Sequence, residues 1–256
     1  MFKIATWNVN SIRVRLPQLL DWLNDKQPDI LALQETKVVD EAFPVADIQA
    51  VGYHALFKGQ KSYNGVALLS RQAGTGVISE LPTFEDTQCR VLGATYQTLR
   101  VLNVYAPNGS PIGSTKYQYK LDWFAHLLTL LKTELKQYKN LVILGDFNVA
   151  PEDCDVYDPK KWEGSVLVSE PERLALRNLI ALGLKETFRL FTQPEKSFSW
   201  WDYRGGSFRL NQGARIDLIL ASQALSTSCT SCQIDVTPRR LERPSDHAPV
   251  MATFDE

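Results

Sequence analysis

The sequence has few of the features that mark secreted, membrane-bound or disulfide-rich proteins. The N-terminal stretch MFKIATWN reaches polar residues too early for the apolar core of a signal peptide. No apolar run approaches the length of a membrane span. Only four cysteines occur in 256 residues, which is too few for a disulfide framework in a chain of this length. We therefore expect a cytoplasmic protein with no membrane partner.

Strong charge and nucleotide-binding motifs are also missing. The net charge is −1, so binding to nucleic acid would depend on a local basic patch. No P-loop GxxxxGK[ST] is present, which argues against nucleoside triphosphate hydrolysis of that type. Cys229 and Cys232 have CxxC spacing without a second pair or a nearby histidine, so we predict free thiols near a strand. Because no repeat or linker divides the chain, we expect one catalytic domain over residues 1–256.

Short apolar runs and amphipathic segments alternate along the chain. Strands are predicted over 2–7, 29–33, 53–57, 66–70, 76–79, 89–96, 99–105, 140–144, 197–201, 215–220, 229–236 and 248–254, and helices over 16–26, 115–136 and 170–182. Residues 152–169 are too irregular to assign. Between 53 and 105 the strands follow one another on short turns, which argues against a (β/α)₈ barrel or a doubly wound parallel sheet. We predict an α/β protein of α+β type: a four-layer sandwich of two mostly antiparallel β-sheets packed face to face, with helices on both outer faces.

Polar side chains follow the predicted strands where these end. In GDFNVAP (145–151), Asp146 and Asn148 come directly after the buried strand NLVIL. Other strand ends carry Asn8, Asn10, Glu35, Tyr105, Asn108, Asp217, Asp246 and His247. Loops at one edge of a rigid sandwich commonly form a site, and many oxygen ligands with few histidines suit Mg²⁺ or Mn²⁺. Such a site suits a phosphodiester, because the cation and an imidazole offset phosphoryl charge while a carboxylate orients or deprotonates water.

Each of these residues also has a simpler interpretation. The Asp-x-Asn sequence is common in ordinary turns. Glu35 and Lys37 could form a solvated ion pair, and Asp217 could pair with the nearby Arg215. His247, like His54 and His126, could be an interior or surface histidine without a chemical role. The pattern alone therefore leaves both interpretations open.

Seven segments of the chain resemble a known family when they are taken together and in order. They are WNVNSIR, LQETK, YNGVALLS, NVYAPNG, GDFNVAP, FSWWDYR with RIDLILAS, and ERPSDHAPV. The set resembles bacterial exonuclease III, in the apurinic/apyrimidinic (AP) endonuclease branch of the endonuclease/exonuclease/phosphatase superfamily. This resemblance implies the two-sheet sandwich and a Mg²⁺-dependent nuclease in which Mn²⁺ can substitute. It also implies a monomer that acts on double-stranded DNA with abasic sites, nicks or blocked 3′ ends.

The resemblance implies roles for individual residues. It places catalytic roles on Tyr105, Asp146, Asn148, Asp217 and His247, metal ligation on Asn10, Glu35 and Asp246, and phosphate or DNA contacts on Asn8, Asn108, Trp200, Arg204 and Ile216. Among these, Glu35 matches the principal Mg²⁺ ligand. Asp217 matches the acid that pairs with His247. Whether Asp146 or Tyr105 accepts the proton, and whether one metal or two act, stays open.

The DNA-facing side is less defined. A candidate phosphate-contacting rim consists of Lys58, Lys61, Lys116, Lys120, Arg204, Arg239, Arg240 and Arg243. The resemblance places Trp200 and Trp201 in the wall of a pocket for an extruded sugar, opposite Ala214 and Ile216. The simpler alternative is that both are core tryptophans. The stretch 162–170 (WEGSVLVSE) is shorter than the matching loop in some family members, and it shapes access to this pocket.

We predict a DNA-repair nuclease with 3′-to-5′ exonuclease and 3′-phosphatase or 3′-phosphodiesterase activity, and with incision 5′ to abasic sites. The alternatives are a paralogue that trims 3′ ends with little internal incision, or another phosphodiesterase of the superfamily.

Overall fold

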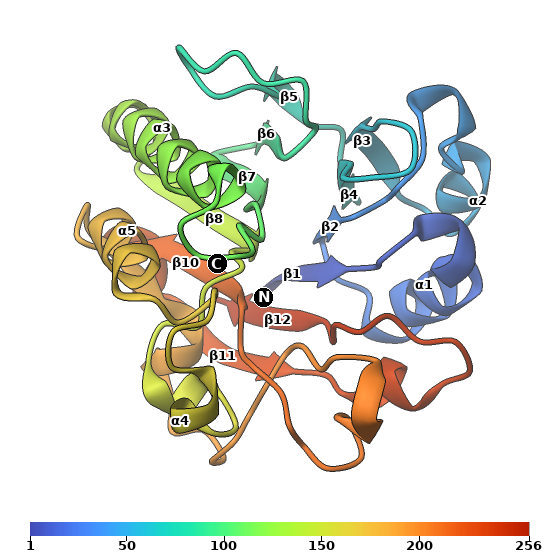
Figure 1. Cartoon of the computed structure of the whole chain (residues 1–256). Helices are drawn as coiled ribbons and strands as arrows, with labels where there is room; N and C mark the ends of the chain where they lie inside the picture. Colours follow the sequence, from blue (N-terminus) through green and yellow to red (C-terminus); the bar gives the residue numbers. More distant parts are fainter. Residues whose placement is uncertain (256) are drawn as a thin grey trace.

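Two six-stranded sheets form the centre of the protein in the computed structural model, which describes residues 1–255 (Figure 1). The first sheet contains, in spatial order, β11 (Cys229–Ile234), β12 (Val250–Phe254), β1 (Phe2–Asn8), β2 (Ile30–Gln34), β4 (Val66–Ser70) and β3 (His54–Lys58). The second contains β5 (Thr75–Ile78), β6 (Val91–Tyr96), β7 (Leu99–Tyr105), β8 (Asn140–Asp146), β10 (Asp217–Ser222) and β9 (Leu184–Glu186). Each sheet has one parallel pair, β1–β2 or β7–β8, and all its other pairs are antiparallel.

Helices cover the outer face of each sheet. The helices are α1 (Ile12–Lys26), α2 (Val45–Ala50), α3 (Thr115–Gln137), α4 (Pro159–Trp162), α5 (Glu170–Ile180) and α6 (Gln223–Ser226). In Figure 1, α1 and α2 lie beside the first sheet and α3 and α5 beside the second. Single 3₁₀ turns occupy Asp40–Ala42, Asp153–Asp155, Thr187–Leu190, Arg204–Gly206 and Thr237–Arg240. The predicted four-layer sandwich is confirmed.

Alternating side chains of the central strands fill separate layers of the core. In β1, Ile4 belongs to the cluster between the two sheets, whereas Ala5 and Trp7 pack with Trp22 of α1. This follows from the two-residue period of a strand. Both faces are buried, so the strands contain almost continuous apolar runs.

The two parallel pairs determine where the strand ends meet. Each is joined by a long helix, α1 between β1 and β2 and α3 between β7 and β8, as a parallel crossover requires. Paired parallel strands finish at the same edge, so Asn8 lies opposite Gln34 and Tyr105 lies opposite Asp146. The residues that follow these strands therefore gather at one end of the sandwich.

Several predicted elements differ from the structure. Residues 197–201 are not a strand, because Trp200 forms only isolated bridges to Ala214 and His247 and the adjoining residues bond to different loops. The unassigned stretch 152–169 contains a 3₁₀ turn and α4. The short elements α2 and β9 were not predicted, since so few residues leave no periodic signal. Helix α1 begins at Ile12, where two backbone bonds tie its start to Glu35 and Thr36.

Two further predictions concern cysteines and membranes. All four cysteines are free, and Cys229 and Cys232 lie in β11 as expected. Among residues 1–255, no helix has both the length and the apolar character needed to cross a bilayer.

Candidate active site

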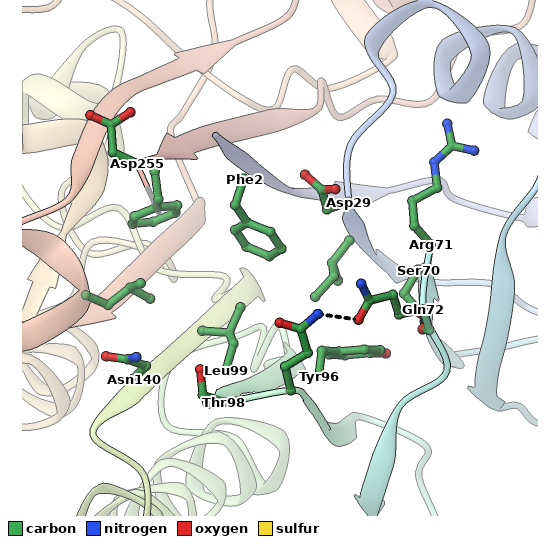
Figure 2. A pocket seen from close by; sticks show the side chains of 14 residues that line it. Phe2, Asp29, Ser70, Arg71, Gln72, Tyr96, Thr98, Leu99, Asn140 and Asp255 are labelled. Carbon is green, nitrogen blue, oxygen red and sulfur yellow. Dashed lines mark hydrogen bonds between the residues drawn. The ribbon is translucent and has the colours of Figure 1, made fainter.

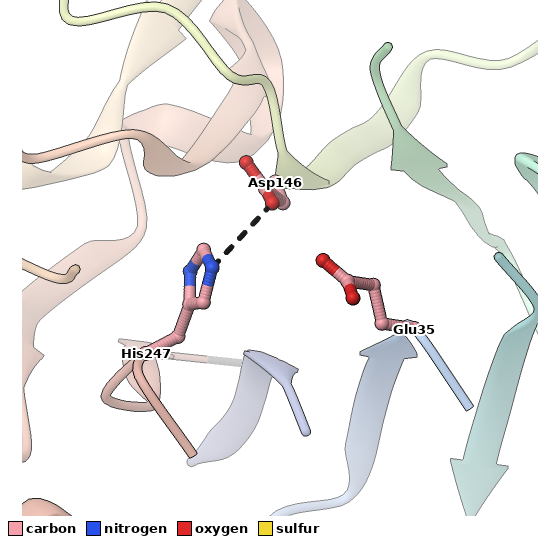
Figure 3. Close-up of side chains that lie close together, drawn as sticks. All are labelled: Glu35, Asp146 and His247. Atoms are coloured by element: carbon pink, nitrogen blue, oxygen red, sulfur yellow. Dashed lines mark ion pairs between the residues drawn. The ribbon is translucent and has the colours of Figure 1, made fainter. Parts of the chain in front are cut away.

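Three of the predicted site residues point into one space at the end of the sandwich (Figure 3). Glu35 follows β2 in the first sheet, Asp146 ends β8 in the second, and His247 precedes β12. One carboxylate oxygen from each acid and one ring nitrogen of His247 all lie within 4.8 Å of one another. Residues far apart in the sequence are thus brought together as the strand-end pattern predicted.

His247 is held by a buried carboxylate. Its Nδ1 lies 2.9 and 3.1 Å from the two oxygens of Asp217, and Ser199 Oγ donates to the nearer one at 2.6 Å. Burial lowers the pKa of His247, but the carboxylates of Asp217 and Asp146 outweigh burial and raise this pKa to about 10. The ring is therefore an imidazolium at neutral pH. The simpler interpretation of Asp217, an ion pair with Arg215, is wrong, because Arg215 pairs with Asp155 and Glu186 instead.

Asp146 is the buried acid on the other side of the imidazolium, with its Oδ2 3.8 Å from His247 Nε2. The backbone N–H of Asn148 donates to Oδ1 at 2.9 Å, and Asn8 Nδ2 donates to Oδ2 at 3.0 Å. Burial raises the pKa of Asp146 to about 7, although the charge of His247 acts in the opposite direction. This acid can therefore exchange a proton near neutral pH.

The glycine before Asp146 allows this position. Gly145 has φ +146°, and a Cβ there would lie 1.9 Å from the carbonyl oxygen of Val104 in the neighbouring strand. Only glycine fits such a close approach of two backbones.

Glu35 receives hydrogen bonds from both sheets. Its Oε1 accepts from Asn8 Nδ2 and from the Tyr105 hydroxyl, each at 2.9 Å. Its Oε2 pairs with Lys37 Nζ at 2.7 Å. The ion pair that the sequence offered as a simpler interpretation is therefore present, but it lies inside the site and not on the solvated surface. Burial raises the pKa of Glu35, but Lys37 and Asn8 outweigh burial and lower it below the usual value. Burial and the charge of Glu35 raise the pKa of Tyr105 well above its ordinary value, so this phenol stays neutral.

Asp246 lies next to Asn10 at the edge of the same space. Asn10 Nδ2 donates to Asp246 Oδ1 at 2.9 Å, and Trp200 Nε1 donates to Oδ2 at 3.0 Å. Burial raises the pKa of Asp246, but His247 and the two donors outweigh burial and lower it. Both oxygens of this carboxylate thus have donors, and the amide of Asn10 is held in one orientation.

The donor set fits a hard divalent cation. Glu35 Oε2 and Asn10 Oδ1 both face one positive group, Lys37 Nζ, which lies 2.7 and 2.5 Å from them. Carboxylate and amide oxygens are the ligands that Mg²⁺ and Mn²⁺ prefer. A protonated imidazole cannot ligate a metal, so His247 is unsuited to that task despite its proximity.

The sequence matches the Endonuclease/Exonuclease/phosphatase family over residues 5–247. The chain belongs to this family. It is 38% identical over 265 residues to exodeoxyribonuclease III of Haemophilus influenzae, covering 98% of this chain and 99% of that protein. It is 33% identical over 254 residues to an exodeoxyribonuclease of Bacillus subtilis, covering 97% of each. The resemblance to exonuclease III is confirmed, and the protein is a hydrolase of the nuclease class.

Solved structures agree with this family. The 3′-5′ exonuclease NExo from Neisseria meningitidis superposes with a TM-score of 0.98 at 46% identity and full coverage of both chains. The same values hold for the D146N form of the 3′ phosphatase NExo from Neisseria bound to a product DNA hairpin. An AP endonuclease from Archaeoglobus fulgidus gives a TM-score of 0.96 at 41% identity, again with full coverage of both chains.

The predicted DNA-contact residues of this nuclease lie in different surroundings. Asn108 is exposed and its Nδ2 lies 3.4 Å from Asn148 Oδ1, next to the site. Arg204 is exposed and pairs with Asp202. Ile216 is buried in an apolar cluster, against which the half-buried Trp200 packs.

Other predictions about this surface are wrong. Lys120 is fully buried, pairs with Glu172 and donates to the backbone oxygen of Asn148 at 2.6 Å, so it cannot contact DNA. Arg239 is buried as well and donates to the Ser245 carbonyl oxygen at 2.5 Å. Both cations support loops of the nuclease from within. Trp201 is a core residue that packs against Phe208, as one alternative had it.

Three residues that hold the site of this nuclease were not predicted. Lys37 bridges Glu35 and Asn10; the sequence offered it only as a solvated partner of Glu35 and as part of LQETK. Ser199 orients Asp217, and its place in FSWWDYR was the only signal for it. Arg15 donates to the Asn10 carbonyl oxygen at 2.6 Å and to the Tyr203 hydroxyl at 2.7 Å.

A separate pocket of about 280 Å³ lies where β1 and β2 begin, at the opposite end of the nuclease (Figure 2). Phe2, Tyr96, Leu99 and Phe254 contribute to its lining, and none of the predicted site residues does. It is therefore distinct from the convergent acids.

Proposed function

We propose that this protein is a Mg²⁺-dependent DNA-repair nuclease that hydrolyses phosphodiesters in duplex DNA. It acts as a 3′-to-5′ exonuclease and removes 3′ phosphates and similar blocks, and it also incises 5′ to abasic sites. The observation that carries this proposal is the convergence of Glu35, Asp146 and the Asp217-bound His247 in one space. The exonuclease, 3′ phosphatase and AP endonuclease relatives support the DNA substrate.

Hydrolysis needs an activated water and a stabilised phosphoryl group. The water oxygen forms a bond to phosphorus while the bond from phosphorus to the leaving sugar oxygen breaks, and this oxygen takes up a proton from solvent to become a hydroxyl. Asp146 accepts the proton of the water, because its pKa of about 7 suits transfer near neutral pH. Asn148 donates its backbone N–H to Asp146 and so fixes the carboxylate that orients the water. The imidazolium of His247 offsets the negative charge that develops on the phosphoryl oxygens.

The structure favours Asp146 over Tyr105 as the proton acceptor. The pKa of Tyr105 lies well above its usual value, so the phenol keeps its proton and donates to Glu35. A phenol that keeps its proton is not a base, and its hydroxyl would donate to a phosphoryl oxygen only by leaving Glu35. We therefore assign Tyr105 a binding role, with Asn108 at the adjoining edge of the site.

Glu35 and Asn10 would hold the divalent cation, and Asp246 orients Asn10. When bound, Mg²⁺ supplies positive charge against the phosphoryl and leaving oxygens. Mn²⁺, which also prefers oxygen ligands, replaces it.

A groove beside the site provides room for the DNA backbone. It has a volume of about 570 Å³, includes Asn108, and is lined also by Arg90, Lys116, Tyr63 and Asn64. Arg90 lies over the ring of Tyr105, with its guanidinium carbon 4.6 Å from the ring centroid. Cations beside amides and an exposed aromatic ring suit a phosphate backbone and its bases. The groove is mainly polar, and Lys116 is its exposed cation while Arg90 is buried.

A specialised 3′-end trimming enzyme is the second candidate. Leu167 and Ile216 belong to one buried apolar cluster, and Trp162 lies edge-on to Trp200 with ring centroids 6.2 Å apart. Internal incision needs space for an extruded sugar on this side, whereas trimming of an existing end does not need full extrusion.

A gel assay tests the proposal and separates these two candidates. It compares a duplex with an internal abasic analogue, a nick carrying a 3′ phosphate, and a plain recessed 3′ end, each with Mg²⁺ and with excess chelator. We expect Mg²⁺-dependent processing of all three substrates. Processing of the two end substrates alone would establish the trimming enzyme. Equal rates in chelator, or no reaction with any DNA, would contradict the proposal.

A further inference from the structure

One lysine occupies the place where the proposed metal ligands point. Lys37 Nζ donates to Asn10 Oδ1 at 2.5 Å and lies 2.7 Å from Glu35 Oε2. We propose that Lys37 is a resident cation that competes with the divalent metal for these two oxygens and is displaced when the metal binds. This inference rests on the proposed function, because it takes the divalent cation from there.

The two oxygens face Lys37 because the other polar atoms of the same side chains are already engaged. Glu35 Oε1 accepts from Asn8 and Tyr105, which leaves Oε2 for a cation. Asn10 Nδ2 donates to Asp246, which turns Oδ1 away from that acid and toward Lys37. The oxygens are therefore oriented without help from Lys37, and a metal would find them in place.

The lysine backbone is fixed while its side chain has room to move. Lys37 N–H donates to the Asn64 carbonyl oxygen at 2.9 Å, and Thr36 N–H donates to that of Gly65 at 3.1 Å. The Lys37 side chain is 26% exposed, so one side of it already faces solvent. A long flexible stem on an anchored backbone allows the ammonium to leave without a change of fold.

Charge makes the two cations exclusive. A divalent ion that ligates Glu35 Oε2 and Asn10 Oδ1 takes the lone pairs to which Lys37 donates, and it repels the ammonium. In the absence of metal, Lys37 balances the charge of Glu35 beside the other acids of the site. The lysine thus neutralises part of the negative charge in the metal-free protein and weakens metal binding at the same time.

A lysine that only supported Glu35 would have the opposite effect. Its removal would let the carboxylate move and would weaken metal binding. Removal of a competitor instead strengthens metal binding. The sign of the change in metal affinity therefore separates the two roles.

Titration of the DNA-free protein with Mn²⁺ measures whether the Kd for the metal rises or falls. Electron paramagnetic resonance reports the concentration of free Mn²⁺ at each step. We expect Lys37→Gln to lower the Kd for Mn²⁺ about three- to tenfold, the range for loss of a partly exposed ion pair and its charge. Lys37→Arg keeps the charge and should stay close to the wild type. Lys132→Gln removes an exposed charge on α3 and should leave the Kd unchanged.

A higher or unchanged Kd for Lys37→Gln would overturn the inference while leaving the metal site itself intact. Failure of the wild-type protein to bind Mn²⁺ would instead overturn the metal role in the proposed function.

Lysine acylation of the wild-type protein gives a second test that needs no variant. Displacement by metal should raise the labelling rate of Lys37 severalfold when Mn²⁺ is added, with Lys132 as the internal reference in the same mass spectrum. An unchanged or lower Lys37 rate at saturating Mn²⁺ would overturn the inference.

Discussion

Asp217→Asn is the change that most sharply tests the electrostatics of the site. Asp217 contacts His247 Nδ1 at 2.9 and 3.1 Å and is the largest of the influences that raise the pKa of this histidine to about 10. The rise from 6.5 corresponds to roughly 5 kcal/mol of preference for the imidazolium at ~1.4 kcal/mol per pKa unit. Because burial acts against this rise and Asp217 is the largest influence that produces it, we expect the variant to lower the pKa of His247 by about two units or more.

Nuclear magnetic resonance titration measures this pKa directly, because the protein has only three histidines. His54 and His126 serve as internal references, since they lie outside the site. We expect the pKa of His247 to fall by about two units or more in metal-free Asp217→Asn and the rate of DNA cleavage to fall by about 10²-fold or more at pH 8. An unchanged pKa of His247 would refute the assignment of Asp217 as its charge partner.

The same shift has a consequence for stability. The folded-state pKa of His247 lies above its unfolded value of 6.5, so the charged ring stabilises the fold fully below pH 6.5, and this contribution is lost as pH rises through about 10. The Tm of the metal-free wild type should therefore fall more between pH 7 and pH 10 than the Tm of Asp217→Asn. Parallel curves for the two proteins would contradict this.

Three other substitutions address separate parts of the account. Asp146→Asn should reduce turnover about 10³-fold or more while duplex binding in a filter assay stays near the wild-type value, and substantial turnover would remove Asp146 as the base. Glu35→Ala should raise the Mg²⁺ concentration needed for half-maximal cleavage about tenfold or more, and an unchanged metal titration would exclude Glu35 as a ligand. Lys120→Met should lower the free energy of unfolding in urea by about 3–5 kcal/mol, because it leaves the buried carboxylate of Glu172 without a positive partner. Lys116→Met at an exposed position should change it by less than about 0.5 kcal/mol.

The sequence predicted the sandwich because short apolar runs alternate with amphipathic segments, and because consecutive strands on short turns between 53 and 105 indicate antiparallel pairing. It also predicted which residues gather, because polar side chains directly follow several strands. The structure adds the reason, since the parallel strands β7 and β8 end at one edge. The strand predicted over residues 197–201 was wrong, because alternation of aromatic and polar residues is also the pattern of a half-buried strand. In the structure, Trp200 and Trp201 bond instead to two different loops.

The directions of individual charged side chains could not be predicted from the sequence. Lys120 has the helical spacing of the buried face of α3, four residues before Phe124, but its charge suggests a surface position. Glu172, 52 positions later, allows it to be buried. Arg215 lies two residues from Asp217, but it precedes β10, and its guanidinium pairs with Asp155 and Glu186, whereas Asp217 contacts His247. Long-range pairing of this kind leaves no local pattern.

A Mn²⁺ soak of crystals, with anomalous difference density recorded, tests the central claim most directly. We expect the strongest peak at ligand distance from Glu35 Oε2 and Asn10 Oδ1, in the space that Asp146 and His247 also face. Density elsewhere, with nothing beside Glu35 under conditions in which the protein cleaves DNA, would contradict the claim that these converged residues form the metal-dependent catalytic site.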